Sequence, residues 1–115
     1  MDQLVELLTK EDLNKVWKVS KSKPVLLFKQ STTCPISAKA FKQYHQFIDE
    51  TDLDIDFYFV KVRETRDVSN QIAEDTGIEH QSPQIFLIKD EHVLWNTSHS
   101  NITREAIQEA LASKL

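Results

Sequence analysis

The chain has 115 residues, of which 40 % are hydrophobic and 28 % are charged, and its formal net charge is −4 at pH 7. This size and composition predict one soluble domain over residues 1–115. The negative charge argues against nucleic acid and anionic membranes as partners. No apolar run approaches the roughly 20 residues of a membrane span. The first residues lack the pattern of a signal peptide, and a single cysteine suits a reducing compartment, so we expect a cytoplasmic protein.

The first predicted elements are a helix, a strand and a second helix. Thr9 can cap a helix with acids in its first turn. Residues 25–30 form a strand that is too apolar for a sheet edge. Pro35 suits the first turn of the next helix, which we expect to run to about Asp49. Its predicted inward face consists of Ala38, Phe41, Tyr44 or His45, and Ile48.

The second half of the chain continues the alternation. Residues 55–62 are rich in β-branched and aromatic side chains and predict a strand. A helix from about Val68 should end at Gly77, the only glycine, in the left-handed conformation. Residues 84–88 and 92–95 are apolar and close together, which favours an antiparallel hairpin, although Asp-Glu is not a favoured turn pair.

A last amphipathic helix begins at Thr103. The predicted order is therefore α-β-α-β-α-β-β-α. The two βα crossovers require parallel pairing, whereas the last two strands pair antiparallel. This is an α/β protein with a central mixed four-stranded sheet and helices on both of its faces.

Cys34 is the only cysteine, and it lies where the first predicted strand gives way to the second helix. A lone thiol cannot close an internal disulfide, so a redox role requires a partner from outside the chain. A helix N-terminus favours an anion, and the thiolate is the form that attacks disulfides. Pro35 removes one amide donor there, but the hydroxyl of Ser37 can donate to the sulfur. Lys29 and Lys39 add positive charge.

Three segments carry a resemblance to known proteins. The order of elements, with a cysteine after the first strand and Ser82-Pro83 before the third, resembles the thioredoxin-like layout. Residues 72–78 and 82–87 resemble the thioredoxin stretch from the end of a helix, through a glycine, to the cis-proline loop. Residues 28–37 resemble the active-site segment of the bacilliredoxin-like family of small monothiol proteins, also called bacillithiol system redox-active proteins.

The resemblance implies an enzyme, a monothiol thiol-disulfide oxidoreductase that removes bacillithiol from protein mixed disulfides. It implies bacillithiol as a co-substrate, no bound cofactor and no metal. Cys34 takes the position of the nucleophile and Ser37 that of the resolving cysteine. Pro35 and Pro83 would support catalysis, the latter as the cis-proline that faces the thiol. The residues expected to bind the thiol or substrate are Lys29, Thr33, Ser82 and His99.

The same resemblance implies partners: bacillithiol, bacillithiolated client proteins and a flavin-dependent bacillithiol disulfide reductase. We expect a monomer with a role in the stress response. The chain lacks the Gly-Gly pair of glutaredoxins and has Asn96-Thr97-Ser98 instead, which argues against glutathione as the natural thiol. The motif Cys-Pro-Ile-Ser at residues 34–37, in place of Cys-Gly-Phe-Ser, weakens an iron–sulfur interpretation.

Two other functions remain open from the sequence. The protein could carry an iron–sulfur cluster or metal, as monothiol glutaredoxins do, with Cys34 of two chains and two external thiols as ligands. Alternatively, it could be a non-catalytic thioredoxin-like module that binds stress-related partners through the Pro83 face. The four histidines show no paired ligand spacing, so no zinc site is predicted.

Overall fold

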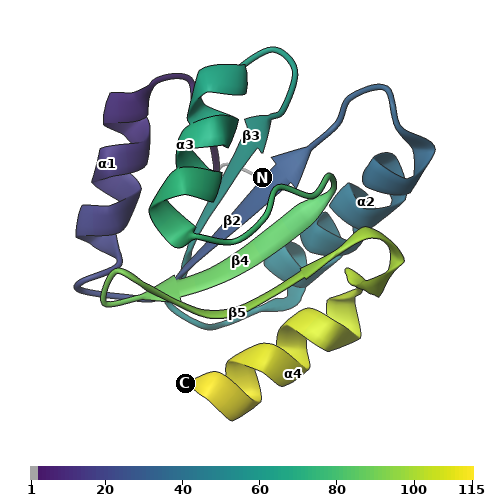
Figure 1. Cartoon of the computed structure of the whole chain (residues 1–115). Helices are drawn as coiled ribbons and strands as arrows, with labels where there is room; N and C mark the ends of the chain where they lie inside the picture. Colours follow the sequence, from purple (N-terminus) through teal and green to yellow (C-terminus); the bar gives the residue numbers. More distant parts are fainter. Residues whose placement is uncertain (1–2) are drawn as a thin grey trace.

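A five-stranded sheet with two helices on each face forms the protein (Figure 1). The computed structural model describes residues 3–115. Residues 1 and 2, which belong to the N-terminal stretch in which no signal peptide is expected, lie outside the described residues. The elements are β1 (Leu4–Glu6), α1 (Lys10–Val19), β2 (Val25–Gln30), α2 (Pro35–Glu50), β3 (Asp56–Lys61), α3 (Arg66–Thr76), β4 (Gln84–Lys89), β5 (His92–Ser98), the 3₁₀ turn η1 (His99–Asn101) and α4 (Arg104–Lys114).

The sheet is mixed, as predicted, and its strand order is β1-β3-β2-β4-β5. Strands β1 and β2 both pair parallel with β3, whereas β4 pairs antiparallel with β2 and with β5. Helices α1 and α3 cover one face and α2 and α4 the other (Figure 1). The predicted count of four strands was one too low. Strand β1 has three residues, too few to show an alternating pattern, and only its pairing with β3 reveals it.

Local sequence signals placed most element ends correctly. Thr9 caps α1 in a reciprocal capping box with Asp12, and Thr103 caps α4. Gly77 ends α3 in the left-handed conformation, with φ of 69°. The β4–β5 hairpin is confirmed, and its unfavoured turn pair, Asp90 and Glu91, takes positive φ values of 53° and 62°.

The predicted inward face of α2 was wrong at one position. Ala38 is exposed, and Ser37 takes its place on the buried side. From Ser37, the buried positions of α2 recur at helical spacing through Ala40, Tyr44 and Ile48. A serine can occupy this face because its hydroxyl finds a backbone partner there, as described below.

The sheet separates two hydrophobic cores. The core beneath α2 and α4 contains a cluster of aromatic rings that includes Phe28, Tyr44 and Phe57. The core beneath α1 and α3 is mainly aliphatic. Within residues 3–115, no helix is long and apolar enough to cross a membrane.

Candidate active site at the N-terminus of α2

Cys34 lies at the N-cap of α2, just beyond the end of the central strand β2. Its amide donates to the carbonyl of Ser31 at 3.4 Å, and its carbonyl accepts from the amide of Ala38 at 3.0 Å. The side chain is half-buried and makes no capping hydrogen bond. Thr33, the preceding residue, is exposed. The short loop after β2 therefore leaves the thiol accessible at the positive end of a sixteen-residue helix.

The first turn of α2 differs from that of the other helices in residues 3–115. Helices α1, α3 and α4 each carry an acid in their first turn, whereas α2 carries none. A carboxylate at that position would neutralise the partial positive charge of the helix end. Its absence leaves that charge available to an anion at the N-cap, where Cys34 lies.

Ser37 is fully buried beneath the Cys34 loop. Its hydroxyl oxygen accepts a hydrogen bond of 2.8 Å from the amide of Ser31. Ser37 therefore ties the first turn of α2 to the loop that precedes Cys34. The structure shows no hydrogen bond from Ser37 to the Cys34 sulfur, so the expected donation to sulfur stays a prediction. Pro35 occupies the first turn of α2, as expected.

The Ser82-Pro83 peptide bond is cis. Pro83 lies at the start of β4, and because β4 runs antiparallel to β2, it lies at the same end of the sheet as Cys34. The carbonyl of Pro83 accepts a 3.0 Å hydrogen bond from the amide of His99, which itself has a left-handed φ of 56°. The hydroxyl of Ser82 is buried and has no hydrogen-bond partner within residues 3–115. The proline loop and η1 thus form one connected edge of the site.

Lys29 is fully buried, although it was predicted to contact the low-molecular-weight thiol. Its Nζ lies 3.1 Å from Nδ1 of His80, in the loop before Pro83. Burial lowers the pKa of Lys29 to about 8. The pKa of His80 is also lowered, by burial first and then by the positive charges of Lys29 and Arg66. A direct contact between Lys29 and a bound thiol stays a prediction.

The roles of His80 and Gln84 at the site were not predicted from the sequence. Gln84, the first residue of β4, is 1 % exposed, and both ends of its side-chain amide bond the loop before Pro83. His80 meets a residue 51 positions away in the chain. No local pattern signals either contact. The one available signal was Gln84 itself, a polar residue at the head of a strand that is otherwise apolar apart from its last residue.

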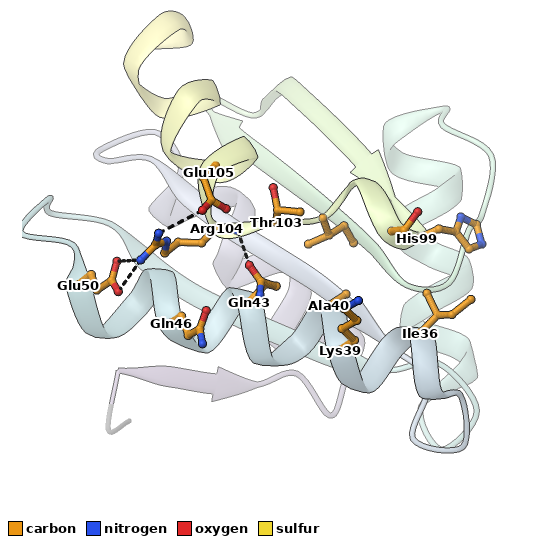
Figure 2. Close-up of a pocket in the computed structure, with 12 residues that line it drawn as sticks. Ile36, Lys39, Ala40, Gln43, Gln46, Glu50, His99, Thr103, Arg104 and Glu105 are labelled. Carbon is orange, nitrogen blue, oxygen red and sulfur yellow. Dashed lines mark hydrogen bonds and ion pairs between the residues drawn. The ribbon is translucent and has the colours of Figure 1, made fainter.

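A groove of about 600 Å³ runs between α2 and the segment from η1 to the start of α4. Ile36, in the first turn of α2, and His99 lie at one end of it (Figure 2). At the other end, Arg104 forms ion pairs with Glu50 and Glu105 (Figure 2). Polar side chains between these ends include Lys39, Gln43 and Gln46. The groove begins one turn from the thiol, and its lining combines a larger apolar surface with a few polar side chains, as ligand pockets commonly do.

Within residues 3–115, no group of three or more His, Cys, Asp or Glu side chains is placed to hold a metal ion. The chemistry that the arrangement supports comes from the thiol. The site combines one accessible cysteine at a helix N-terminus, a buried serine in the first turn of the same helix, and a cis-proline loop at the same end of the sheet.

The fold and this site define a monothiol protein of the thioredoxin fold. A solved structure described as a candidate oxidoreductase with a thioredoxin fold has a TM-score of 0.86 and 33 % sequence identity, covering 96 % of this chain and 95 % of that chain. A thioredoxin of Fasciola hepatica has a TM-score of 0.76 at 15 % identity, covering 96 % and 98 %. Thioredoxin f of the spinach chloroplast has a TM-score of 0.75 at 17 % identity, covering 97 % and 93 %.

The sequence profile of a family described as Monothiol bacilliredoxin BrxC matches residues 5–107, nearly the whole chain. The protein belongs to this family. The thioredoxin-like fold and the family are therefore both as the sequence predicted, and they establish a thiol redox role.

Proposed function

We propose that the protein removes bacillithiol from protein mixed disulfides, with Cys34 as the nucleophile. The observation that carries the proposal is the single accessible thiol at the N-cap of α2, with Ser37 where a dithiol protein would place its resolving cysteine. Membership of the monothiol bacilliredoxin family supports bacillithiol as the thiol.

The reaction is a thiol–disulfide exchange in two steps. The Cys34 thiolate attacks the bacillithiol sulfur of the mixed disulfide; a bond forms between these two sulfurs, and the bond to the client sulfur breaks. The client leaves as a thiolate and takes a proton from water. A second bacillithiol thiolate then attacks the bacillithiol sulfur on Cys34. This step releases oxidised bacillithiol and restores the Cys34 thiolate.

The residues around Cys34 have separate tasks in this proposal. Ser37 holds the loop and cannot resolve the intermediate, so the second thiol must come from solution. The backbone of Ser82, before the cis Pro83, binds the client side of the disulfide in an extended conformation. Bacillithiol lies in the groove that begins at Ile36 and His99 and has Lys39 in its lining. The exposed Thr33 contacts it beside Cys34. No bound cofactor takes part.

The partners follow from the reaction. Bacillithiolated proteins are the clients, and a flavin-dependent bacillithiol disulfide reductase regenerates the reduced thiol. The reaction needs a reducing compartment that contains bacillithiol, so we propose a cytoplasmic monomer that acts under oxidative stress.

The test is the release of bacillithiol from a bacillithiolated peptide by the purified protein with bacillithiol as reductant. We expect turnover with the wild-type chain, none with Cys34→Ala, and slightly slower turnover with Ser37→Ala. The same peptide carrying glutathione is the control for thiol selectivity and should react more slowly. Full activity in Cys34→Ala would contradict the mechanism, and equal rates with the two thiols would contradict the choice of bacillithiol.

A further inference from the structure

Two buried polar side chains lie side by side beneath the loop that carries the cis-proline. Lys29 on β2 and Gln84 on β4 are directly paired in the antiparallel register. Paired residues project from the same face of a sheet. Leu27 and Phe86 project from this face into the aliphatic core, and Lys29 and Gln84 follow them at its end nearest the site. Both polar side chains are 1 % exposed or less.

Their contacts go to three consecutive residues of the loop between α3 and β4. The side-chain nitrogen of Gln84 donates to the carbonyl of Glu79 at 3.2 Å, and its oxygen accepts from the amide of Gln81 at 3.2 Å. Lys29 Nζ lies 3.1 Å from His80 Nδ1. A loop without sheet pairing has backbone groups to satisfy, and buried side chains meet part of that need here. Residues 79–81 are therefore held one after another, immediately before Ser82 and Pro83.

The direction of the Lys29–His80 bond follows from the chemistry of the two groups. An ammonium group has no lone pair, so Lys29 donates and Nδ1 of His80 accepts. His80 must then be neutral, with its proton on Nε2. The charged groups acting on His80 are Lys29 from β2 and Arg66 from the start of α3, and both positive charges favour the neutral ring. The bond is thus compatible with its surroundings at neutral pH.

The position of Lys29 is unfavourable for stability. A buried amine without an opposite charge has a large desolvation cost. Burial is the cause that shifts the pKa of Lys29, and no carboxylate within residues 3–115 offsets it. An apolar side chain of similar length would fill the same space without this penalty. A costly group that bonds a loop at the redox site points to a role in function.

We propose that Lys29 and Gln84 are positioning residues for thiol exchange, which hold residues 79–81 so that Ser82 and Pro83 bind the disulfide substrate in a fixed register with Cys34. The inference rests on the proposed function, and it assigns Lys29 to the support of the proline loop. His80 is the loop residue through which Lys29 acts.

The test compares Lys29→Met and Gln84→Met, which keep an unbranched side chain of similar length and remove the polar contacts. For both we expect a roughly 10- to 100-fold lower kcat/KM on a bacillithiolated peptide, the scale of misplacing a binding group. The rate of Cys34 alkylation by iodoacetamide should not change, because alkylation does not need the proline loop. The Gln81 amide should exchange its hydrogen faster, and the unfolding temperature of Lys29→Met should be equal or higher.

Two variants of His80 provide the matched control. In His80→Asn, the side-chain oxygen lies near the position of Nδ1 and can accept from Lys29, so most of the activity should return. His80→Leu has no acceptor and should behave like Lys29→Met in peptide exchange. A reduction that is equal in His80→Asn and His80→Leu would contradict the role of the Lys29–His80 bond.

The outcomes separate this inference from the proposed function. Wild-type kcat/KM and unchanged Gln81 exchange in Lys29→Met and Gln84→Met would overturn the inference. An alkylation rate that falls in step with peptide exchange would also overturn it, because the two residues would then act through the thiolate. If wild-type protein does not act on the bacillithiolated peptide, the proposed function fails. The hydrogen-exchange measurement then decides whether Lys29 and Gln84 hold the loop. Unchanged protection of the Gln81 amide in the two methionine variants overturns the inference, and faster exchange supports the conclusion that these residues hold residues 79–81.

Discussion

The two faces of the sheet bury different chemistry. Beneath α2 and α4, Phe28 and Tyr44 stack with ring centroids 5.3 Å apart, and Phe41 packs against both. Beneath α1 and α3, aliphatic side chains fill most of the space, but the end nearest the site holds Lys29 and Gln84. The aromatic face fixes the helix that carries Cys34. On the other face, burial of Lys29 lowers stability, but Lys29 and Gln84 hold the proline loop. The site therefore depends on one face for the position of Cys34 and on the other for the position of the proline loop.

The largest effect on stability is expected on the aromatic face. Tyr44 is fully buried, and its hydroxyl lies 3.2 Å from the carbonyl of Leu26 and 3.1 Å from that of Tyr58. Tyr44→Ala should lower the free energy of unfolding by about 3–5 kcal/mol. The control Tyr44→Phe removes only the hydrogen bonds and should lower it by about 1–2 kcal/mol. Chemical denaturation measures both, and equal losses would mean that the ring contributes nothing.

The buried amine predicts a pH dependence of stability on the other face. The pKa of Lys29 is about 8 in the folded protein and 10.5 in the unfolded chain. Below pH 8, Lys29 is charged in both states, and the full cost of burying the charge is present. Between pH 8 and 10.5, Lys29 is largely neutral in the folded protein but still charged in the unfolded chain, so the free energy of unfolding rises with pH. Above pH 10.5, Lys29 is neutral in both states and the cost of burying its charge is gone.

The size of this effect follows from the two pKa values and is on the order of 3 kcal/mol. Comparison with Lys29→Met removes the contributions of other groups that titrate in the same range. The wild-type protein should be the less stable of the two at pH 7 and should approach the variant as the pH rises to 10.5. A difference in stability that stays constant from pH 7 to 10.5 would contradict the burial of the Lys29 amine without an opposite charge.

Ser37 tests how strongly the aromatic face controls the Cys34 loop. Ser37→Ala removes the acceptor for the amide of Ser31. The loss of this buried hydrogen bond should lower the free energy of unfolding by about 1 kcal/mol and slow thiol exchange only modestly. Denaturation and peptide turnover measure the two effects. A complete loss of turnover in a folded variant would give Ser37 a direct chemical role that the loop contact does not explain.

Gly77, on the aliphatic face, is expected to affect stability alone, by about as much as Ser37, and not thiol exchange. Its φ of 69° suits glycine, and a Cβ there would meet no atom within 4 Å. Gly77→Ala should therefore lower the free energy of unfolding through backbone strain alone, by about 1 kcal/mol. Gly77→Asn should lower it less, because asparagine tolerates this conformation. Thiol exchange should not change, since the contacts to residues 79–81 remain; a large reduction would mean that the proline loop depends on the end of α3.

Much of the fold could be predicted because its signals are local. The Thr9 cap, the glycine at the end of α3 and the alternating apolar runs each depend on a few adjacent residues. The missed strand β1 and the outward Ala38 had no such signal. A three-residue strand is recognised only by its pairing with another strand, and the inward face of α2 depends on the hydrogen bond that the Ser31 amide donates to Ser37.

The site residues likewise fall into those with a local sequence signal and those defined by long-range contacts. Cys34, Pro35 and Pro83 are placed by motifs that the sequence shows directly. The burial of Lys29 and its contact with His80 arise only when β2 meets a loop 51 residues away. The support of Gln84 for that loop likewise depends on how the chain turns before Pro83, which no local pattern encodes.

The most direct test of Cys34 as a thiol selective for bacillithiol is the intact mass of the protein after exposure to oxidised bacillithiol and, separately, to oxidised glutathione. We expect one bacillithiol adduct per chain, located on Cys34, that forms much faster than the glutathione adduct and is absent from Cys34→Ala. A Cys34 that forms no bacillithiol adduct, or that forms both adducts at the same rate, would contradict this expectation.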